Sequence, residues 1–106
     1  MKLQSEIKRT LTIGGESVTF TLRRPSNQEL NTFLASRHEV GKRGSLKDTS
    51  NEARGALFDK LVTGISGLED DAGAPIGPEQ KDLIPANWKA AVIFSAFEDM
   101  EIDEKN

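Results

Sequence analysis

The chain has 106 residues, a formal net charge of −3 and no cysteine. That length fits one domain with a small core, and the lack of cysteine excludes disulfide bonds and thiolate metal sites. No stretch approaches the roughly 20 apolar residues that a membrane-spanning helix needs, and the opening MKLQSEIKRT lacks the apolar core of a signal peptide. We therefore expect a soluble cytoplasmic protein with one domain over residues 1–100 and a frayed acidic tail at 101–106.

Charge is spread unevenly along the chain. Residues 1–50 carry nine Lys/Arg against five Asp/Glu, whereas residues 51–106 carry five against twelve. This asymmetry can steer the protein toward partners or allow self-association, and it can equally reflect two faces that are solvated differently. The charge pattern alone identifies no partner.

The first predicted element is a β-hairpin, because apolar and polar residues alternate on both sides of a Gly14-Gly15-Glu16 turn. A two-residue loop at Gly15-Glu16 places Ile13 opposite Val18. A loop at Gly14-Gly15 keeps the same faces but places Ile13 opposite Glu16, so we prefer the first register. A hairpin is marginal alone and must pack on helices or on another strand.

A helix is predicted to follow, because residues 26–29 have the S-x-x-E form of a capping box between Ser26 and Glu29. It fades near His38, where a basic loop, RHEVGKRGSLK, begins. A second helix, capped by a polar residue at 48–50, is predicted from apolar residues at helical spacing between Ala53 and Ile65. We expect Gly64 and Gly67 to close that second helix, and Pro78 to start a short helical turn.

The last predicted helix runs from about Pro85 to Met100, and it carries two apolar stripes. One stripe is expected to be core and consists of Trp88, Ala91, Val92, Ser95 and Ala96, with Trp88 against Leu57 and Leu61. The other, on nearly the opposite side, consists of Ile93, Phe97 and Met100. A helix that is apolar on both sides is either buried between layers or offers one side to a partner. Ile93, Phe97 and Met100 are therefore our candidate partner-binding residues.

These elements predict an α+β fold in which an N-terminal β-hairpin packs on three to four helices. The acidic loop 68–79 fails as an EF-hand, since Gly73 at the sixth position and Glu79 at the twelfth leave Leu68 and Ala72 at ligand positions. We interpret it as a solvated turn. The single histidine, His38, lies in a basic loop without a cluster of ligands, and no serine lies in a G-x-S-x-G elbow. We expect no catalytic residue, cofactor or metal.

Seven basic residues of the N-terminal half invite a nucleic-acid test: Lys8, Arg9, Arg23, Arg24, Arg37, Lys42 and Arg43. Phosphate contact needs them on one face, but Arg23 and Arg24 point to opposite sides of a strand end. Aromatic stacking partners are also missing, since Phe20 and Phe33 belong to apolar stripes. The sequence thus argues against nucleic-acid binding.

The order of segments adds a family resemblance. A strand pair ends in TLRRPSNQEL, a helix-loop-helix follows, then come VTGISGLEDDAGAPI and LIPANWKAAVIFSAFE. This layout resembles the small tail assembly chaperones of tailed phages and their prophage relatives. In those proteins an R-x-P-S/T junction leads from a strand pair into helices. A G-L-x-D-x-x-G-x-P turn then precedes a final helix that begins with Pro and holds W-K and F-E.

The resemblance implies a non-enzymatic function in the cytoplasm of a bacterial host. Such proteins bind the tape-measure protein during tail morphogenesis, help to recruit tail-tube subunits, and are absent from the finished particle. Two alternatives stay open at this point. One is a structural phage component, either a minor tail protein or a head–tail connector, and the other is a small regulatory binding module.

Overall fold

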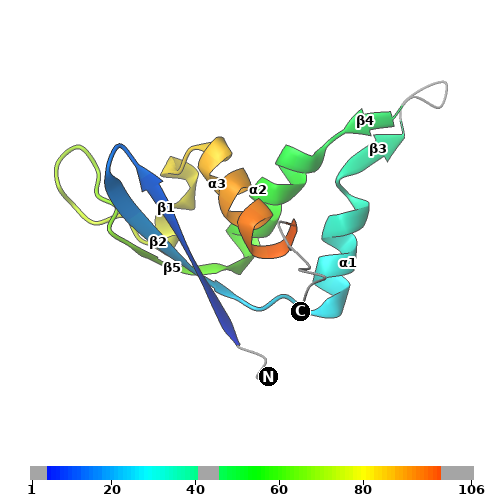
Figure 1. The fold of residues 1–106 in the computed structure, drawn as a ribbon, viewed down its shortest axis with the longest axis horizontal. Helices are drawn as coiled ribbons and strands as arrows, with labels where there is room; N and C mark the ends of the chain where they lie inside the picture. Colours follow the sequence, from blue (N-terminus) through cyan, green and yellow to red (C-terminus); the bar gives the residue numbers. More distant parts are fainter. Residues whose placement is uncertain (1–4, 41–45, 99–106) are drawn as a thin grey trace, which may run out of the picture.

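The computed structural model describes residues 5–40 and 46–98, and it confirms the α+β class. Its centre is an antiparallel sheet in the order β1-β2-β5, formed by β1 (Glu6–Ile13), β2 (Glu16–Arg23) and β5 (Val62–Ser66). The hairpin was predicted, but the third strand was not. Figure 1 shows β5 beside β2 although a long stretch of chain separates them.

The hairpin turn lies at Gly14-Gly15, so Ile13 is opposite Glu16, and our preferred register was wrong. Both glycines have positive φ, 59° at Gly14 and 84° at Gly15. Two consecutive left-handed residues make a type I′ turn, whose twist matches that of the flanking strands. Glycine adopts these angles at both positions without steric cost, and a loop at Gly15-Glu16 would have left the first glycine in the strand.

The sheet has one buried face and one open face. Val18, Phe20 and Leu22 of β2 point to the buried face, where their exposed fractions are 5%, 0% and 0%. On the open face the Thr10 and Thr19 hydroxyls lie 3.0 Å apart in a cross-strand pair. The predicted period-two pattern is therefore correct even though the loop was misplaced, because both loops keep the same faces.

Helix α1 (Asn27–Ala35) begins with the predicted capping box. The Glu29 backbone N–H donates to the Ser26 hydroxyl at 3.1 Å, and the Ser26 N–H donates to the Glu29 carboxylate at 2.9 Å. These two bonds satisfy backbone donors that the first turn of a helix leaves without partners. The prediction is confirmed.

The basic loop after α1 contains two short strands, β3 (His38–Val40) and β4 (Leu46–Asp48), that pair with each other. Figure 1 shows this ribbon extending away from the sheet at the far end of α1 and α2. Strands of three residues are too short to show a period-two pattern, so they could not be predicted from periodicity.

Helix α2 (Ser50–Leu61) begins where expected but is shorter than predicted. From Val62 the chain turns into β5, which pairs with β2 through Phe20 opposite Ile65. Val62 and Ile65 fit the spacing of a helix, but β-branched residues also favour strands. The open edge of β2 decides between the two, because it supplies hydrogen bonds that sequence spacing cannot reveal.

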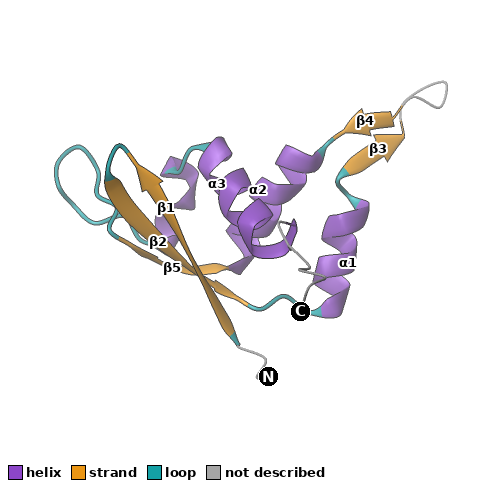
Figure 2. Ribbon diagram, viewed as in Figure 1, coloured by secondary structure: helices purple, strands orange, loops and turns teal. Residues whose placement is uncertain are grey.

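The last part of the chain forms a 3₁₀ segment (Pro78–Leu83), helix α3 (Ala86–Ile93) and a π-helical turn (Phe94–Glu98) (Figure 2). The helical turn at Pro78 and the helix start at Pro85 are confirmed. The predicted helix to Met100 widens after Ile93, and residues 99 to 106, including Met100 and the predicted frayed tail, lie outside the described residues.

Helices α2 and α3 pack on each other and cover the buried face of the sheet (Figure 1). At the centre, the rings of Phe20 and Phe58 meet edge to face with centroids 5.5 Å apart, and both side chains are fully buried. The remaining buried members of this core are Val18, Leu22, Phe33, Leu57, Leu61, Val62, Ile84, Val92 and Ile93. None of the described helices is long and apolar enough to cross a membrane.

The type I′ turn yields a prediction with an internal control. Gly15→Ala should lower the free energy of unfolding by about 1–2 kcal/mol, because alanine must take a left-handed conformation. Gly14→Asn should stay within about 0.5 kcal/mol of the wild type, since Asn-Gly is a preferred type I′ pair. A Cβ at either position has open space around it, so only backbone strain is tested. Equal denaturant midpoints for the two variants would contradict the turn.

Candidate functional site

Within the described residues, the predicted partner stripe reaches the surface at Phe97, which lines a hollow of about 460 Å³ with Leu30 and residues 24–27. Ile93 is fully buried and belongs to the core, as does its neighbour Val92. Phe97 is partly buried against that core, and Met100 lies outside the described residues. Helix α3 is apolar on both sides because it contacts α2 on one side and β1 on the other. Of the two readings left open by the sequence, burial applies at Ile93.

The other predicted stripe is only partly in the core. Trp88 is half-buried and packs on the core cluster that contains Leu57 and Leu61, but Ala91 is exposed. Phe94, which belonged to neither stripe, is 45% exposed. Its ring lies under the Arg54 guanidinium at 5.3 Å. The π-helical turn shifts the residues after Ile93 away from the positions that ideal α-helical spacing predicts.

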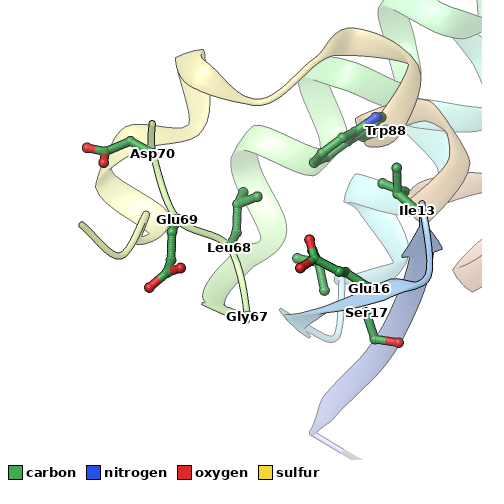
Figure 3. Close-up of a pocket in the computed structure, with 9 residues that line it drawn as sticks. Ile13, Glu16, Ser17, Gly67, Leu68, Glu69, Asp70 and Trp88 are labelled. Atoms are coloured by element: carbon green, nitrogen blue, oxygen red, sulfur yellow. The ribbon is translucent and has the colours of Figure 1, made fainter. Parts of the chain in front are cut away.

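Trp88 opens onto a hollow of about 510 Å³ between the hairpin turn and the loop after β5 (Figure 3). We call it the Trp88 hollow. Its lining comes from three separate segments: Ile13, Glu16, Ser17 and Val18 of the hairpin, Gly67, Leu68, Glu69 and Asp70 of the loop, and Trp88 of α3. A volume of this size falls in the range of ligand-binding clefts.

Backbone geometry holds the loop wall of the hollow in place. Gly67 has φ +89°, and a Cβ there would lie 2.7 Å from the Ser17 carbonyl oxygen, so glycine lets the chain run close against β2. Beyond it, the Ile76 N–H donates to the Leu68 carbonyl at 2.9 Å, next to a bridge between Glu69 and Pro75. The loop is therefore anchored on both sides of Leu68.

The acidic stretch of this loop is a hydrogen-bonded turn. Asp70 Oδ1 accepts from the backbone N–H groups of Ala72 and Ala74, each at 2.9 Å. Gly73 takes the left-handed conformation with φ +84°. A carboxylate bonded in this way shapes the turn. Within residues 5–40 and 46–98, no three His, Asp or Glu side chains gather as a metal site would require.

The Trp88 hollow combines an apolar floor with acidic surroundings. Ile13, Val18, Leu68 and Trp88 supply apolar surface. All the ionisable residues of the lining are acids, and no Lys or Arg is among them. Figure 3 shows the Leu68 side chain and the Glu16 carboxylate directed toward the space in front of Trp88, with the Glu69 and Asp70 carboxylates directed outward. Such an arrangement can bind an apolar group that carries positive charge beside it.

A second cluster of charges has a structural role. The Glu98 side chain is 5% exposed and accepts from Arg54 at 2.6 Å and from Arg37 at 3.1 Å. The hydrogen bond from Arg54 is the main cause that holds the pKa of Glu98 below its usual value. Because Arg37 follows α1 and Arg54 belongs to α2, Glu98 fastens the π-helical turn to both helices.

Several basic residues that could have contacted nucleic acid are already paired or separated. Arg23 makes two hydrogen bonds to Glu29, at 2.8 Å and 2.7 Å, and Arg37 pairs with Glu98. Lys8 and Arg9 are consecutive in β1 and point to opposite faces of the sheet. Lys42 and Arg43 lie outside the described residues. The described members of the set thus do not form one basic face.

Comparison of the chain with models of known protein families, with curated proteins and with solved structures found no match.

The Trp88 hollow was not predicted from the sequence. Its walls come from segments that are distant in the chain. The hairpin turn meets the loop only because β5 pairs with β2, whereas we had predicted that this part of the chain belongs to the second helix. The one available signal was the single tryptophan in the first turn of the last helix, because tryptophan is enriched among the residues that dominate binding at protein interfaces.

The Glu29 and Glu98 ion pairs predict acid sensitivity. Hydrogen bonding, chiefly from Arg23, lowers the pKa of Glu29 to about 2, and the pKa of Glu98 is lowered as well. Groups with depressed folded-state pKa values stabilise the fold above their unfolded pKa and lose that effect as pH falls toward the folded value. The denaturant concentration at the unfolding midpoint should therefore decrease as the pH is lowered from about 5 to about 2. Glu29→Gln and Glu98→Gln should each weaken this pH dependence, whereas the exposed control Glu52→Gln should retain it. If the midpoint changes equally with pH in the wild type and all three variants, the ion pairs are not the cause of the acid sensitivity.

The acidic surroundings of Trp88 predict that a cationic quencher reaches its indole more readily than an anionic one. Because Glu16 points toward the hollow, Cs⁺ should reach the indole more readily than iodide at matched ionic strength. Glu16→Gln should narrow the difference between the two quenchers, and Glu52→Gln, on the first turn of α2, should leave it as in the wild type. Both quenching constants are expressed relative to those of free N-acetyltryptophanamide. Relative iodide quenching that equals or exceeds relative Cs⁺ quenching in the wild type would show that the ring does not face the acidic hollow.

Proposed function

We propose that this chain is a non-enzymatic tail assembly chaperone of a tailed phage or prophage, which binds the tape-measure and tail-tube proteins during morphogenesis. The proposal starts from the resemblance in segment order and rests on where those segments lie in the fold. The R-R-P-S junction joins the end of β2 to the start of α1.

One observation carries the proposal. Two of the other segments in the resemblance, the turn that begins Gly67-Leu68 and the helix that holds Trp88, form opposite walls of the Trp88 hollow. A half-buried tryptophan beside an apolar floor is typical of the residues that dominate binding energy at protein interfaces. Two of the segments that carry the resemblance therefore meet at a surface that suits a protein partner.

The geometry suits temporary binding. A hollow of about 510 Å³ accommodates only a few side chains of a partner, and an interface confined to it is small. Interfaces of modest area with few anchoring residues give modest affinity and release their partners readily. Such a surface can cover an apolar segment of the tape-measure protein until a tube subunit replaces it.

The test asks whether the chain binds the tape-measure protein and whether it is absent from the finished particle. Co-expressed with the tape-measure protein of the same phage or prophage, the tagged chain should co-purify with that protein, and deletion of the reading frame for this chain should stop tail formation. Quantitative mass spectrometry of purified particles should find the tape-measure protein without this chain.

A fixed number of copies per finished particle would identify a structural component, either a minor tail protein or a head–tail connector, and would reject the chaperone. Normal tails in the deletion strain would reject any role in tail assembly and favour the regulatory binding module.

A further inference from the structure

We infer that the Trp88 hollow binds a partner segment in which an apolar side chain stands next to an arginine or lysine. This inference deepens the proposed function and rests on it for the identity of the partner. It specifies the docking surface and the chemistry that this surface selects, and it moves the partner-binding role from Ile93 and Phe97 to the side of α3 that carries Trp88.

The apolar component follows from the floor of the hollow. Leu68 points toward Trp88, and Ile13, at the end of β1, remains 38% exposed beside them. These side chains come from a strand end, an anchored loop and a helix, so their relative positions are held by the fold. Covering them with an aliphatic or aromatic side chain removes apolar surface from water on both partners.

The cationic component follows from charge. The ionisable residues that line the hollow are Glu16, Glu69 and Asp70, and neither Glu16 nor Glu69 forms an ion pair with any residue in the described ranges. Glu16 is fully available, since the structure gives its carboxylate no hydrogen bond within those ranges. A guanidinium or ammonium next to the bound apolar side chain can pair with it in a site partly shielded from water.

The same charges select the class of partner. Phosphate groups of nucleic acid would be repelled by three carboxylates, whereas a peptide segment with mixed apolar and basic residues is complementary to both components of the hollow. A second copy of the chain would instead supply basic residues from its N-terminal half, and this occupant would appear as dimers in sedimentation.

Trp88 is the only tryptophan, so its emission reports directly on the hollow. The full chain is titrated with the peptide Gly-Arg-Leu-Leu-Arg-Gly and with two matched peptides, one with both arginines replaced by glutamate and one with both leucines replaced by serine. We expect a saturable change in emission with the first peptide and at least roughly tenfold weaker binding of the other two. Glu16→Gln should weaken the first peptide roughly threefold to tenfold, and Glu52→Gln should not weaken it.

Three results would overturn the inference: no change in emission up to about 1 mM peptide, a range beyond which affinity is too weak for recognition; equal binding of all three peptides; or undiminished binding by Glu16→Gln with its circular dichroism unchanged. A change in emission with protein concentration alone, accompanied by dimers in sedimentation, would instead assign the hollow to a second copy and would also overturn it.

Failure of the inference and failure of the proposed function are separable. If Glu16→Gln co-purifies with the tape-measure protein at wild-type yield, the chaperone role stands and the hollow is not its docking surface. If the peptides discriminate as expected but the tape-measure protein does not co-purify, the hollow is a binding site and its partner lies outside tail assembly.

Discussion

The contact between Phe20 of β2 and Phe58 of α2 is the interaction on which the rest of the fold depends. Phe20 lies in the middle strand of the sheet, and Phe58 lies on the helix that leads directly into β5. Burying this pair fixes α2 over the sheet, and the turn at its end then brings β5 to the free edge of β2. Edge-to-face aromatic pairs add about 0.5–1.5 kcal/mol beyond the surface they bury, which is substantial for a domain of this size.

Features that depend on neighbouring residues could be predicted from the sequence, whereas pairing between distant segments could not. The capping box of Ser26 and Glu29 and the alternation of the hairpin depend on neighbours within a few residues, and both were predicted correctly. The turn register depended on whether Gly14-Gly15 or Gly15-Glu16 forms the two-residue loop, and these two alternatives differ little in energy. Strand β5 depended on a partner edge about 40 residues earlier in the chain, which outweighed the helical spacing of Val62 and Ile65.

The candidate site shows the same division. A helix that is apolar on both sides was identified correctly, but the sequence could not say which side stays accessible, and Ile93 proved to be core. An accessible hollow that was not predicted lies at the other end of α3, where Trp88 meets Leu68 and the hairpin turn. No sequence pattern unites three segments that converge only through sheet pairing. The acidic loop, which we interpreted as a solvated turn, also forms a wall of the hollow, and its Asp70 carboxylate is bonded to the backbone of the same loop.

The central claim is that partners bind at the Trp88 hollow, and the indole N–H of the single tryptophan is its most direct reporter. In a ¹H–¹⁵N spectrum this group gives one side-chain signal that is separate from the backbone amides. Adding purified tape-measure protein should shift or broaden that signal together with the amides of residues 67–70, while the amides of the β3–β4 ribbon stay unchanged. An unmoved indole signal, with changes gathered instead around Phe97, would contradict the claim and place the partner away from the Trp88 hollow.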